Sequence, residues 1–251
     1  MATMTTKQHV SFIDRVKATR SRLAELETNT GLAAQSGEAD QELLNQWNAA
    51  CRAWNWLRRD RGKRYADCTF DNYQITNDKQ QRVVDKLREY AADPKNIENG
   101  VGVVLYGTKG CGKDHLLMAL AHAMVGLHGI CPLWVNGATL HTELKREDFD
   151  DPNRPSSLVR FGNDPRTAPI LWVSDPLPPS GALSEYQQKL ILEVIDRRYS
   201  SMLPTWTTMN VASGSEAEER LGAQAVDRLC HGSLVLACGW KSYRTVGEAS
   251  S

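Results

Sequence analysis

The stretch YGTKGCGKDHLL at residues 106–117 contains the most specific motif of the chain. Gly107, Gly112 and Lys113 fit the pattern G-x-x-x-x-G-K, which requires a strand before it and a helix after it. The sequence supplies both, because the apolar run VGVVLY leads into the motif and an amphipathic segment follows it. In such a loop, backbone N–H groups and the following helix N-terminus bind phosphate. The motif therefore predicts a nucleotide-binding P-loop.

We expect the whole loop to contact the nucleotide, with Lys113 reaching the β and γ phosphates. The predicted binding residues are Gly107, Thr108, Lys109, Gly110, Cys111, Gly112, Lys113, Asp114 and His115. Asp114 stands where a Ser or Thr usually ligates magnesium, and a carboxylate is itself a good ligand for a hard cation. Without the metal, its negative charge would weaken phosphate binding. A purely structural role in the first helical turn stays open.

Strands and helices alternate on both sides of the motif from about residue 65. Short apolar runs suited to buried strands lie at residues 101–106, 131–136, 169–175, 205–210 and 233–238. Helical segments such as DHLLMALAHAMVGLHG and SEYQQKLILEVIDRRYSS lie between them. This alternation predicts a five-stranded parallel sheet covered by helices on both faces, which is a three-layer α/β domain.

Two polar residues end predicted strands at the sheet edge where ligands of open α/β sheets bind. Asp175 closes the run ILWVSD as the acid of a Walker B strand does, so Asp114 and Asp175 are the predicted magnesium ligands. Asn210 closes TWTTMN, where its side chain would orient water or the γ phosphate. Pro176 occupies the usual place of a catalytic glutamate, which predicts slow hydrolysis unless another carboxylate such as Glu185 substitutes for it.

The front of the chain is predicted to form a helical hairpin. A short helix is expected from Ser11, and a second helix over residues 41–64. The apolar stripe of the second helix comprises Leu43, Trp47, Ala50, Cys51, Trp54 and Leu57. We expect this stripe to close the core of the hairpin itself and to leave Trp56, Arg58 and Arg59 exposed.

The charge distribution also separates the front of the chain from the rest. The 251 residues contain equal numbers of basic and acidic side chains, yet residues 1–66 carry 3 Lys and 8 Arg against 7 acids. This excess indicates either a docking surface for a partner or DNA backbone, or a solvated helix face. We therefore divide the chain into an N-terminal helical partner-binding domain at residues 1–62 and an ATPase domain at residues 63–251.

Composition excludes several other classes of protein. The sequence has no run of about eighteen apolar residues, so no membrane span is predicted. Its N-terminus lacks the apolar block of a secretory signal, which predicts a cytoplasmic protein. The six cysteines form no CxxC pair and no ligand-like cluster with histidines, which argues against a zinc site and favours reduced thiols.

The order of these motifs resembles that of the AAA+ ATPases of the DnaC-type helicase loaders and the related IstB-type transposition helper proteins. The resemblance runs from YADCTFDNY at 65–73 to GWKSYR at 239–244, and its F-x-N-Y lead-in is carried by Phe70, Asn72 and Tyr73. It implies an AAA+ P-loop NTPase domain behind a small N-terminal helical domain, with ATP and Mg²⁺ as cofactors. Members of this family also depart from Ser or Thr after the loop lysine, so GKDH is less unusual among them.

The resemblance also assigns roles by position. Lys113 corresponds to the loop lysine, Asp175 to the Walker B acid and Asn210 to the sensor. Arg228, in AVDRLCHGS, corresponds to the arginine finger that reaches the nucleotide of the next subunit. The implied partners are the replicative DNA helicase, gripped through the N-terminal helices, single-stranded DNA, and further copies of the chain assembled in the ATP state.

Three other functions remain as alternatives to a helicase loader. An IstB-like ATPase would deliver a transposase to target DNA, and the partner of residues 1–66 would distinguish it. A small-molecule kinase on a P-loop fold is disfavoured, because the sequence shows no arginine-rich lid insert. A nucleotide-binding scaffold with little hydrolysis agrees with Pro176 in the place of the catalytic acid.

Overall fold

The computed structural model describes residues 38–149 and 164–244, together with Leu158 and the isolated positions 14, 17, 18 and 21. The helix predicted from Ser11 lies for the most part outside the described residues. The five strands are β1 (Val103–Tyr106), β2 (Leu133–Asn136), β3 (Leu171–Ser174), β4 (Thr205–Met209) and β5 (Leu234–Ala237). Each falls within a run predicted from the sequence, so all five predicted strands are confirmed.

The strands form one parallel sheet in the order β2-β3-β4-β1-β5. Strands β1, β3 and β4 are in the middle and consist almost wholly of buried residues, whereas the edge strand β5 is partly exposed. In a parallel sheet the carboxyl ends of the strands meet at one edge. The ends of β1, β3 and β4 are therefore neighbours, and the three motifs that follow them lie close together.

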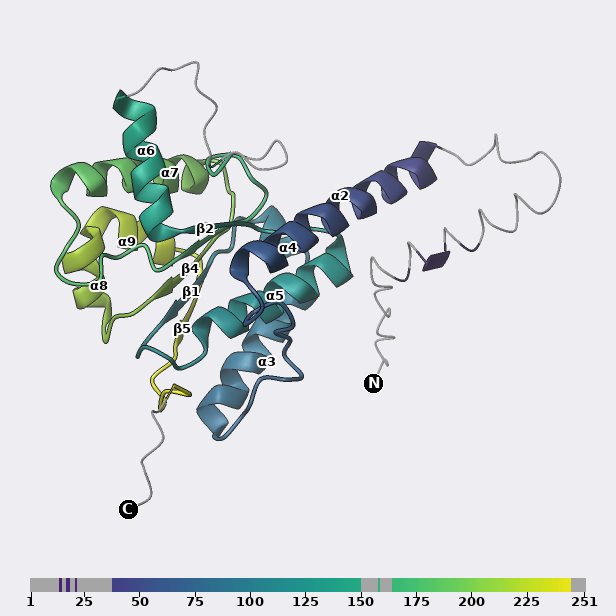
Figure 1. Cartoon of the computed structure of the whole chain (residues 1–251), viewed down its shortest axis with the longest axis horizontal. Helices are drawn as coiled ribbons and strands as arrows, with labels where there is room; N and C mark the ends of the chain where they lie inside the picture. The colour runs from purple at the N-terminus through teal and green to yellow at the C-terminus, as the bar shows by residue number, and fades with distance from the viewer. Residues whose placement is uncertain are drawn as a thin grey trace, which may run out of the picture.

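Helices cover both faces of the sheet, as the sequence predicts. The described helices are α2 (Glu38–Arg61), α3 (Asp78–Ala92), α4 (Lys95–Glu98), α5 (Lys113–His128), α6 (Gly137–Phe149), α7 (Glu185–Ser200), α8 (Gly214–Leu221) and α9 (Ala223–Cys230). Figure 1 shows α3 and α5 on one side of the sheet and α6, α7, α8 and α9 on the other. Each side has its own apolar cluster, so the domain has three layers.

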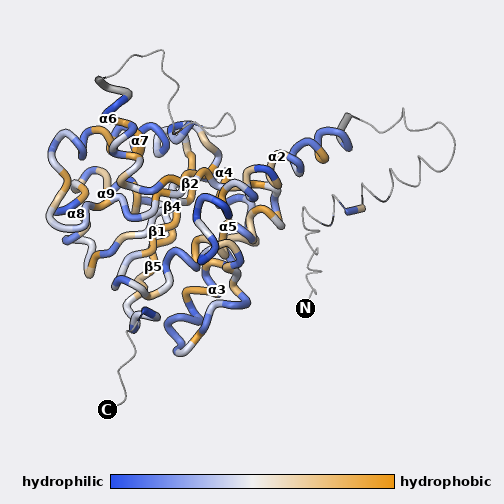
Figure 2. Tube along the Cα trace, in the orientation of Figure 1, coloured by the Kyte–Doolittle hydropathy of each residue, from blue (hydrophilic) through white to orange (hydrophobic). Residues whose placement is uncertain are grey.

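The apolar residues concentrate between these layers. Figure 2 shows the hydrophobic colouring along the central strands and α5, while hydrophilic residues predominate along the projecting part of α2. Two strand tryptophans, Trp172 and Trp206, are fully buried beside the helices that cover the sheet. None of the described helices has both the length and the apolar character needed to cross a bilayer.

Helix α2 confirms the predicted second helix, but its apolar stripe packs differently from the prediction. Leu57 is only 1 % exposed and belongs to the core cluster that α3 and α5 form with the sheet. Trp54 stacks on His122 of α5 with ring centroids 5.5 Å apart. The expectation that the stripe closes the hairpin's own core is therefore wrong for these two residues, which pack on the core of the α/β domain and on α5.

The packing of α2 makes a specific prediction about stability. Leu57→Ala should lower the free energy of unfolding by about 2–5 kcal/mol, because it removes a fully buried side chain and leaves a cavity. Asn55→Ala, on the exposed side of the same helix, is the matched control and should change stability little. Urea unfolding of both variants measures the difference. Equal stabilities would show that α2 does not pack on the domain.

Candidate nucleotide-binding site

The P-loop joins β1 to α5 through a backbone that only glycine adopts easily. Gly107, Gly110 and Gly112 all have positive φ angles, of 140°, 81° and 92°. A Cβ atom at Gly107 would overlap the carbonyl of Cys238, and one at Gly112 would lie 2.8 Å from the Tyr73 ring. The glycines are therefore required by the loop conformation and by the close approach of neighbouring segments.

Lys113, the first residue of α5, is 5 % exposed and connects the loop to the sheet edge. Its Nζ donates hydrogen bonds to the carbonyls of Gly107 at 2.9 Å and Thr108 at 2.8 Å. A third hydrogen bond runs to Oδ1 of Asn210 at 2.9 Å. A buried ammonium is stable only where hydrogen-bond acceptors surround it. Phosphate oxygens that enter the loop would be stronger acceptors than the carbonyl and amide oxygens that now accept from Lys113.

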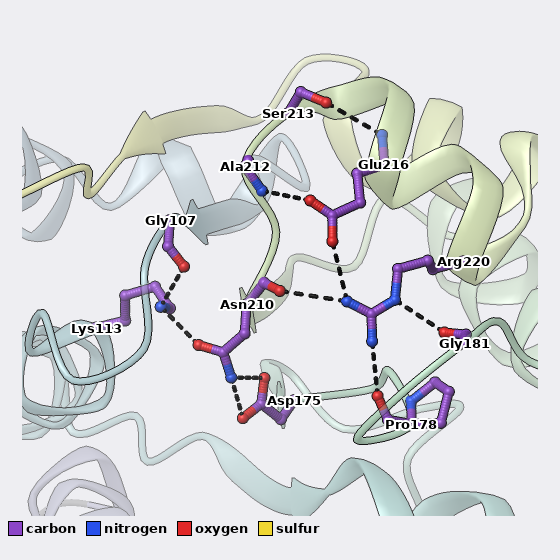
Figure 3. A network of polar contacts seen from close by, with 10 residues as sticks. All are labelled: Gly107, Lys113, Asp175, Pro178, Gly181, Asn210, Ala212, Ser213, Glu216 and Arg220. Carbon is purple, nitrogen blue, oxygen red and sulfur yellow. Dashed lines mark hydrogen bonds and ion pairs between the residues drawn. The ribbon is translucent and has the colours of Figure 1, made fainter.

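Asn210 lies between Lys113 and Asp175 at the carboxyl ends of β4 and β3 (Figure 3). Its Nδ2 donates to both carboxylate oxygens of Asp175 at 2.6 Å, while its Oδ1 accepts from Lys113. Three residues far apart in the sequence thus form one continuous chain of charge-assisted hydrogen bonds. The structure places together the loop lysine, the strand-end acid and the strand-end amide that the sequence singled out.

Asp175 has two properties that distinguish it from an ordinary surface acid. Its φ angle is 51°, in the left-handed region that costs a non-glycine residue conformational energy, and such outliers cluster at functional sites. Burial raises the pKa of its carboxyl, and the nearby negative charge of Asp114 raises it further. Lys113 and Asn210 act in the opposite direction. A bound cation would relieve the repulsion between these two acids.

The carboxylate oxygens at this edge of the sheet are suited to ligate a magnesium ion that also binds phosphate. Asp114 and Asp175 line the same cavity, and the Thr208 hydroxyl lies 3.5 Å from Oδ1 of Asp114. Among the described residues, no group of three or more His, Cys, Asp or Glu side chains forms a cage. Magnesium usually binds through one or two carboxylates plus phosphate oxygens and water, so two carboxylates suit it. The metal would supply positive charge opposite the phosphates.

A cavity of about 690 Å³ extends from the P-loop across the sheet edge. Six of the nine predicted loop residues line it, namely Lys109, Gly110, Gly112, Lys113, Asp114 and His115. The Thr108 hydroxyl and the Cys111 carbonyl turn instead toward Trp240, which holds the C-terminal segment on the loop. Tyr73, from the aromatic lead-in, completes one wall and donates to the Cys111 carbonyl at 3.1 Å.

The segment after β5 adds contacts that the sequence did not predict. The Tyr243 amide donates to the Gly110 carbonyl at 2.9 Å, and the Tyr243 hydroxyl accepts from Nε2 of Gln80 at 2.7 Å. Tyr243 and Arg244 also line the cavity. The sequence signal was the quoted segment GWKSYR, but nothing in its residue types places it over the P-loop.

Arg220 is a second residue that sequence reasoning missed. Its guanidinium, on α8, donates to the carbonyls of Pro178 at 2.7 Å, Gly181 at 2.9 Å and Asn210 at 3.4 Å (Figure 3). Glu216 pairs with it at 3.2 Å. Arg220 therefore fastens the loop that follows the Walker B strand to the strand end that carries Asn210.

The position of the expected catalytic acid holds Pro176, whose carbonyl accepts a hydrogen bond from Nε2 of buried His141 at 2.8 Å. Glu185, considered from the sequence as a substitute, is the first residue of α7 and does not line the cavity. The only carboxylates among the described lining residues are Asp114 and Asp175. No third acid of the cavity wall is thus placed to act as a base.

Arg228 lies away from the cavity, on α9. Its Nε pairs with Asp196 of α7, and its guanidinium also donates to the Gln224 carbonyl at 3.3 Å. The side chain is about one third exposed. It does not line the cavity of its own chain, and its role as an arginine finger for a neighbouring subunit stays a prediction.

Comparison with known proteins identifies the family. The sequence model described as "IstB-like ATP binding protein" matches residues 40–251, which include all but the first two residues of α2 and the entire α/β domain. The chain belongs to this IstB-like ATP-binding family. The family description supports nucleotide binding by this chain, and the resemblance stated from the sequence motifs is confirmed.

Relatives of this IstB-like chain include replicative helicase loaders. It is 28 % identical over 214 residues to the "Replicative helicase loader DnaC" of Buchnera aphidicola subsp. Acyrthosiphon pisum, covering 84 % of this chain and 83 % of the relative. The Escherichia coli (strain K12) loader of the same name is 29 % identical over 184 residues, covering 72 % and 71 %. The chain is thus DnaC-like in sequence over most of its length.

Solved structures agree with this assignment. A crystal structure of the DnaC helicase loader superimposes with a TM-score of 0.62 at 26 % identity, covering 70 % of this chain and 99 % of that one. The AMPPCP-bound DnaA of Aquifex aeolicus gives a TM-score of 0.53 at 15 % identity, covering 70 % and 51 %. The second likeness supports the fold alone, and the predicted AAA+ P-loop architecture is confirmed.

The site geometry predicts how nucleotide affinity depends on Lys113. Lys113→Ala should weaken binding of a non-hydrolysable ATP analogue by about tenfold or more, since hydrogen bonds from a charged group contribute roughly 1.5–3 kcal/mol. Lys189→Ala, an exposed lysine on α7, is the matched control. Isothermal titration with magnesium present measures both. Unchanged affinity in the Lys113 variant would contradict the assignment of this loop.

Proposed function

We propose that this protein is an ATP-dependent loader of a replicative DNA helicase. The observation that carries the proposal is the DnaC-like ATPase domain, matched over nearly all of a DnaC loader structure, with the Lys113–Asn210–Asp175 chain at its nucleotide site. In this proposal ATP and Mg²⁺ set the conformation of the domain, Asp114 and Asp175 hold the metal, and residues 1–62 grip the helicase.

Helix α2 supplies the described part of the partner surface. Asn48, Arg52, Asn55 and Arg59 are exposed at helical spacing, opposite the buried Leu57. Figure 1 shows α2 reaching beyond the rest of the domain along the α5 side. Arginine is among the residues that most often dominate protein interfaces. Arg58 is less available than its neighbours, because its Nε donates to the Ala66 carbonyl at 2.7 Å.

Turnover in this proposal is slow, and the nucleotide acts mainly as a switch. Pro176 offers no acid or base, and the two carboxylates of the cavity wall are assigned to the metal. In this proposal Arg228 reaches the nucleotide of a neighbouring copy, so the protein would form homo-oligomers in the ATP state and hold single-stranded DNA within them. Replication partners of this kind act in the cytoplasm.

A second candidate function follows from the family match. The matching family is described as IstB-like, and an ATPase of that type would deliver a transposase to target DNA instead of a helicase to an origin. The nucleotide site would be the same in both cases. The partner bound by the front of the chain decides between them.

The helicase proposal predicts an effect of charge reversal on α2. Arg52→Glu with Arg59→Glu should abolish capture of the replicative helicase by the full-length protein, since it reverses two charges on the exposed face, while nucleotide affinity stays unchanged. The control is Arg82→Glu with Lys86→Glu, which makes the same charge change on exposed α3 positions. A pull-down with purified helicase is the measurement.

Point variants are preferable here to truncation, because removing α2 would expose the core that Leu57 covers. Undiminished helicase capture by the α2 variant would contradict the docking proposal. Capture of a transposase by the parent, without helicase capture, would favour the second function.

The oligomer proposal predicts complementation between two variants. Arg228→Ala should reduce DNA-dependent assembly and ATP hydrolysis but spare nucleotide binding by the isolated subunit. Mixing it with Lys113→Ala should restore part of the activity, because one interface then contains an intact lysine and an intact arginine. Arg197→Ala, exposed on α7, is the control. If no mixture exceeds the activity of its separate components, Arg228 does not act across subunits.

A further inference from the structure

Arg61, the last residue of α2, ends in a buried aromatic enclosure next to the nucleotide site. Its side chain is 7 % exposed. The guanidinium carbon lies 4.3 Å from the ring centroid of Tyr65, 4.7 Å from that of Trp134 and 4.9 Å from that of Trp172. Three rings therefore surround the cation and attract it through their faces.

The polar partners of Arg61 are fewer than those that a buried guanidinium normally has. Its Nη1 donates to the Ser174 hydroxyl at 3.5 Å, at the limit of a hydrogen bond. Nε and Nη2 are buried and have no hydrogen-bond partner among the residues that the structure describes. The charge is balanced by Asp114, whose Oδ1 lies 3.3 Å from Nη2. Within the described part of the chain, Asp114 is thus the one carboxylate paired with Arg61, and it belongs to the proposed nucleotide site.

Asp114 faces both Arg61 and the cavity. Its side chain is 27 % exposed, and it lines the cavity with Asp175 and Thr208. A divalent cation bound there would take up carboxylate oxygens and would repel the guanidinium a few ångströms away. In this partly buried place the repulsion is little screened by salt. The metal and Arg61 are therefore competitors for one carboxylate.

We propose that Arg61 is a positioning residue that ties the end of α2 to Asp114, and that binding of Mg²⁺ with nucleotide exchanges this tie for the metal. The proposal rests on the proposed function in assigning magnesium and a partner helix to this chain. Arg61 neutralises Asp114 when no metal is bound, which offsets the cost of a carboxylate beside the phosphates. When the metal binds, the guanidinium loses its counter-ion and the end of α2 is released.

The release is local. Leu57 stays buried in the core, and the Arg58 side chain stays bonded to the Ala66 carbonyl. The affected segment is the last turn of α2 and the turn that follows it, residues 59–65. Because Arg59 lies on the proposed partner face and within this segment, nucleotide and partner binding become linked through one ion pair.

The first test measures amide hydrogen exchange over residues 59–65 in the full-length protein without added nucleotide. Arg61→Gln should speed exchange there, and so should Asp114→Asn, which alters a partly exposed side chain and does not depend on refilling the aromatic enclosure. The double variant should exchange no faster than either single one, because both remove the same ion pair. The control is Arg82→Gln, at an exposed position of α3, which should leave exchange over residues 59–65 unchanged. Additive effects in the double variant would overturn the tie.

The second test measures the effect of metal. Adding a non-hydrolysable ATP analogue with Mg²⁺ to the parent should speed exchange over the same segment, whereas the analogue with EDTA should not. Slower or unchanged exchange with Mg²⁺ and the analogue would overturn the proposed competition.

The third test compares analogue affinity with and without Mg²⁺. Arg61→Gln should raise the ratio of the Kd in EDTA to the Kd in Mg²⁺ by about fivefold, the size expected of a modest charge interaction. In an Asp114→Asn background the same substitution should leave the ratio unchanged. A persistent effect in that background would refute a role through Asp114.

These results are separable from failure of the proposed function. Loss of helicase capture would leave the exchange and affinity measurements as predicted. Absence of metal-dependent exchange in a protein that still captures the helicase would overturn the Arg61 proposal alone.

Discussion

The buried ammonium of Lys113 is the interaction on which the arrangement of the site depends. It neutralises carbonyl dipoles of the P-loop on one side and, through Asn210, is connected to Asp175 on the other. A charge that is 5 % exposed must have its acceptors in place, so the loop, β3 and β4 are held in one geometry. The parallel sheet makes this possible, since it brings the carboxyl ends of the three strands to one edge.

The second constraint is the balance of charge around the metal position. Burial raises the pKa of the Asp175 carboxyl, and the nearby negative charge of Asp114 raises it further. Lys113 compensates one side and Arg61 the other. Asp114, which replaces the usual hydroxyl, is therefore accompanied by a compensating cation, the Arg61 guanidinium. This explains how a P-loop tolerates a carboxylate next to its phosphate-binding lysine.

The sheet and the hydrogen-bonded residues Lys113, Asn210 and Asp175 could be predicted from the sequence because both follow from local patterns. Apolar runs of strand length and the G-x-x-x-x-G-K spacing predict that Lys113, Asp175 and Asn210 lie at one edge of the sheet. The contacts of Arg61 and Arg220 could not be predicted in this way, because each side chain contacts segments that are distant in the sequence. The packing of Leu57 was misjudged for a related reason, because periodicity identifies a buried face but not the element that covers it.

We propose that the cavity beside Lys113 holds ATP and a metal ion. The most direct measurement is a crystal structure of the full-length protein with a non-hydrolysable ATP analogue and Mg²⁺. We predict that Nζ of Lys113 leaves the Gly107 and Thr108 carbonyls for the β and γ phosphates, with the metal between those phosphates and the carboxylates of Asp114 and Asp175. A nucleotide bound elsewhere, or phosphates outside the loop with Lys113 still on its carbonyls, would contradict the account.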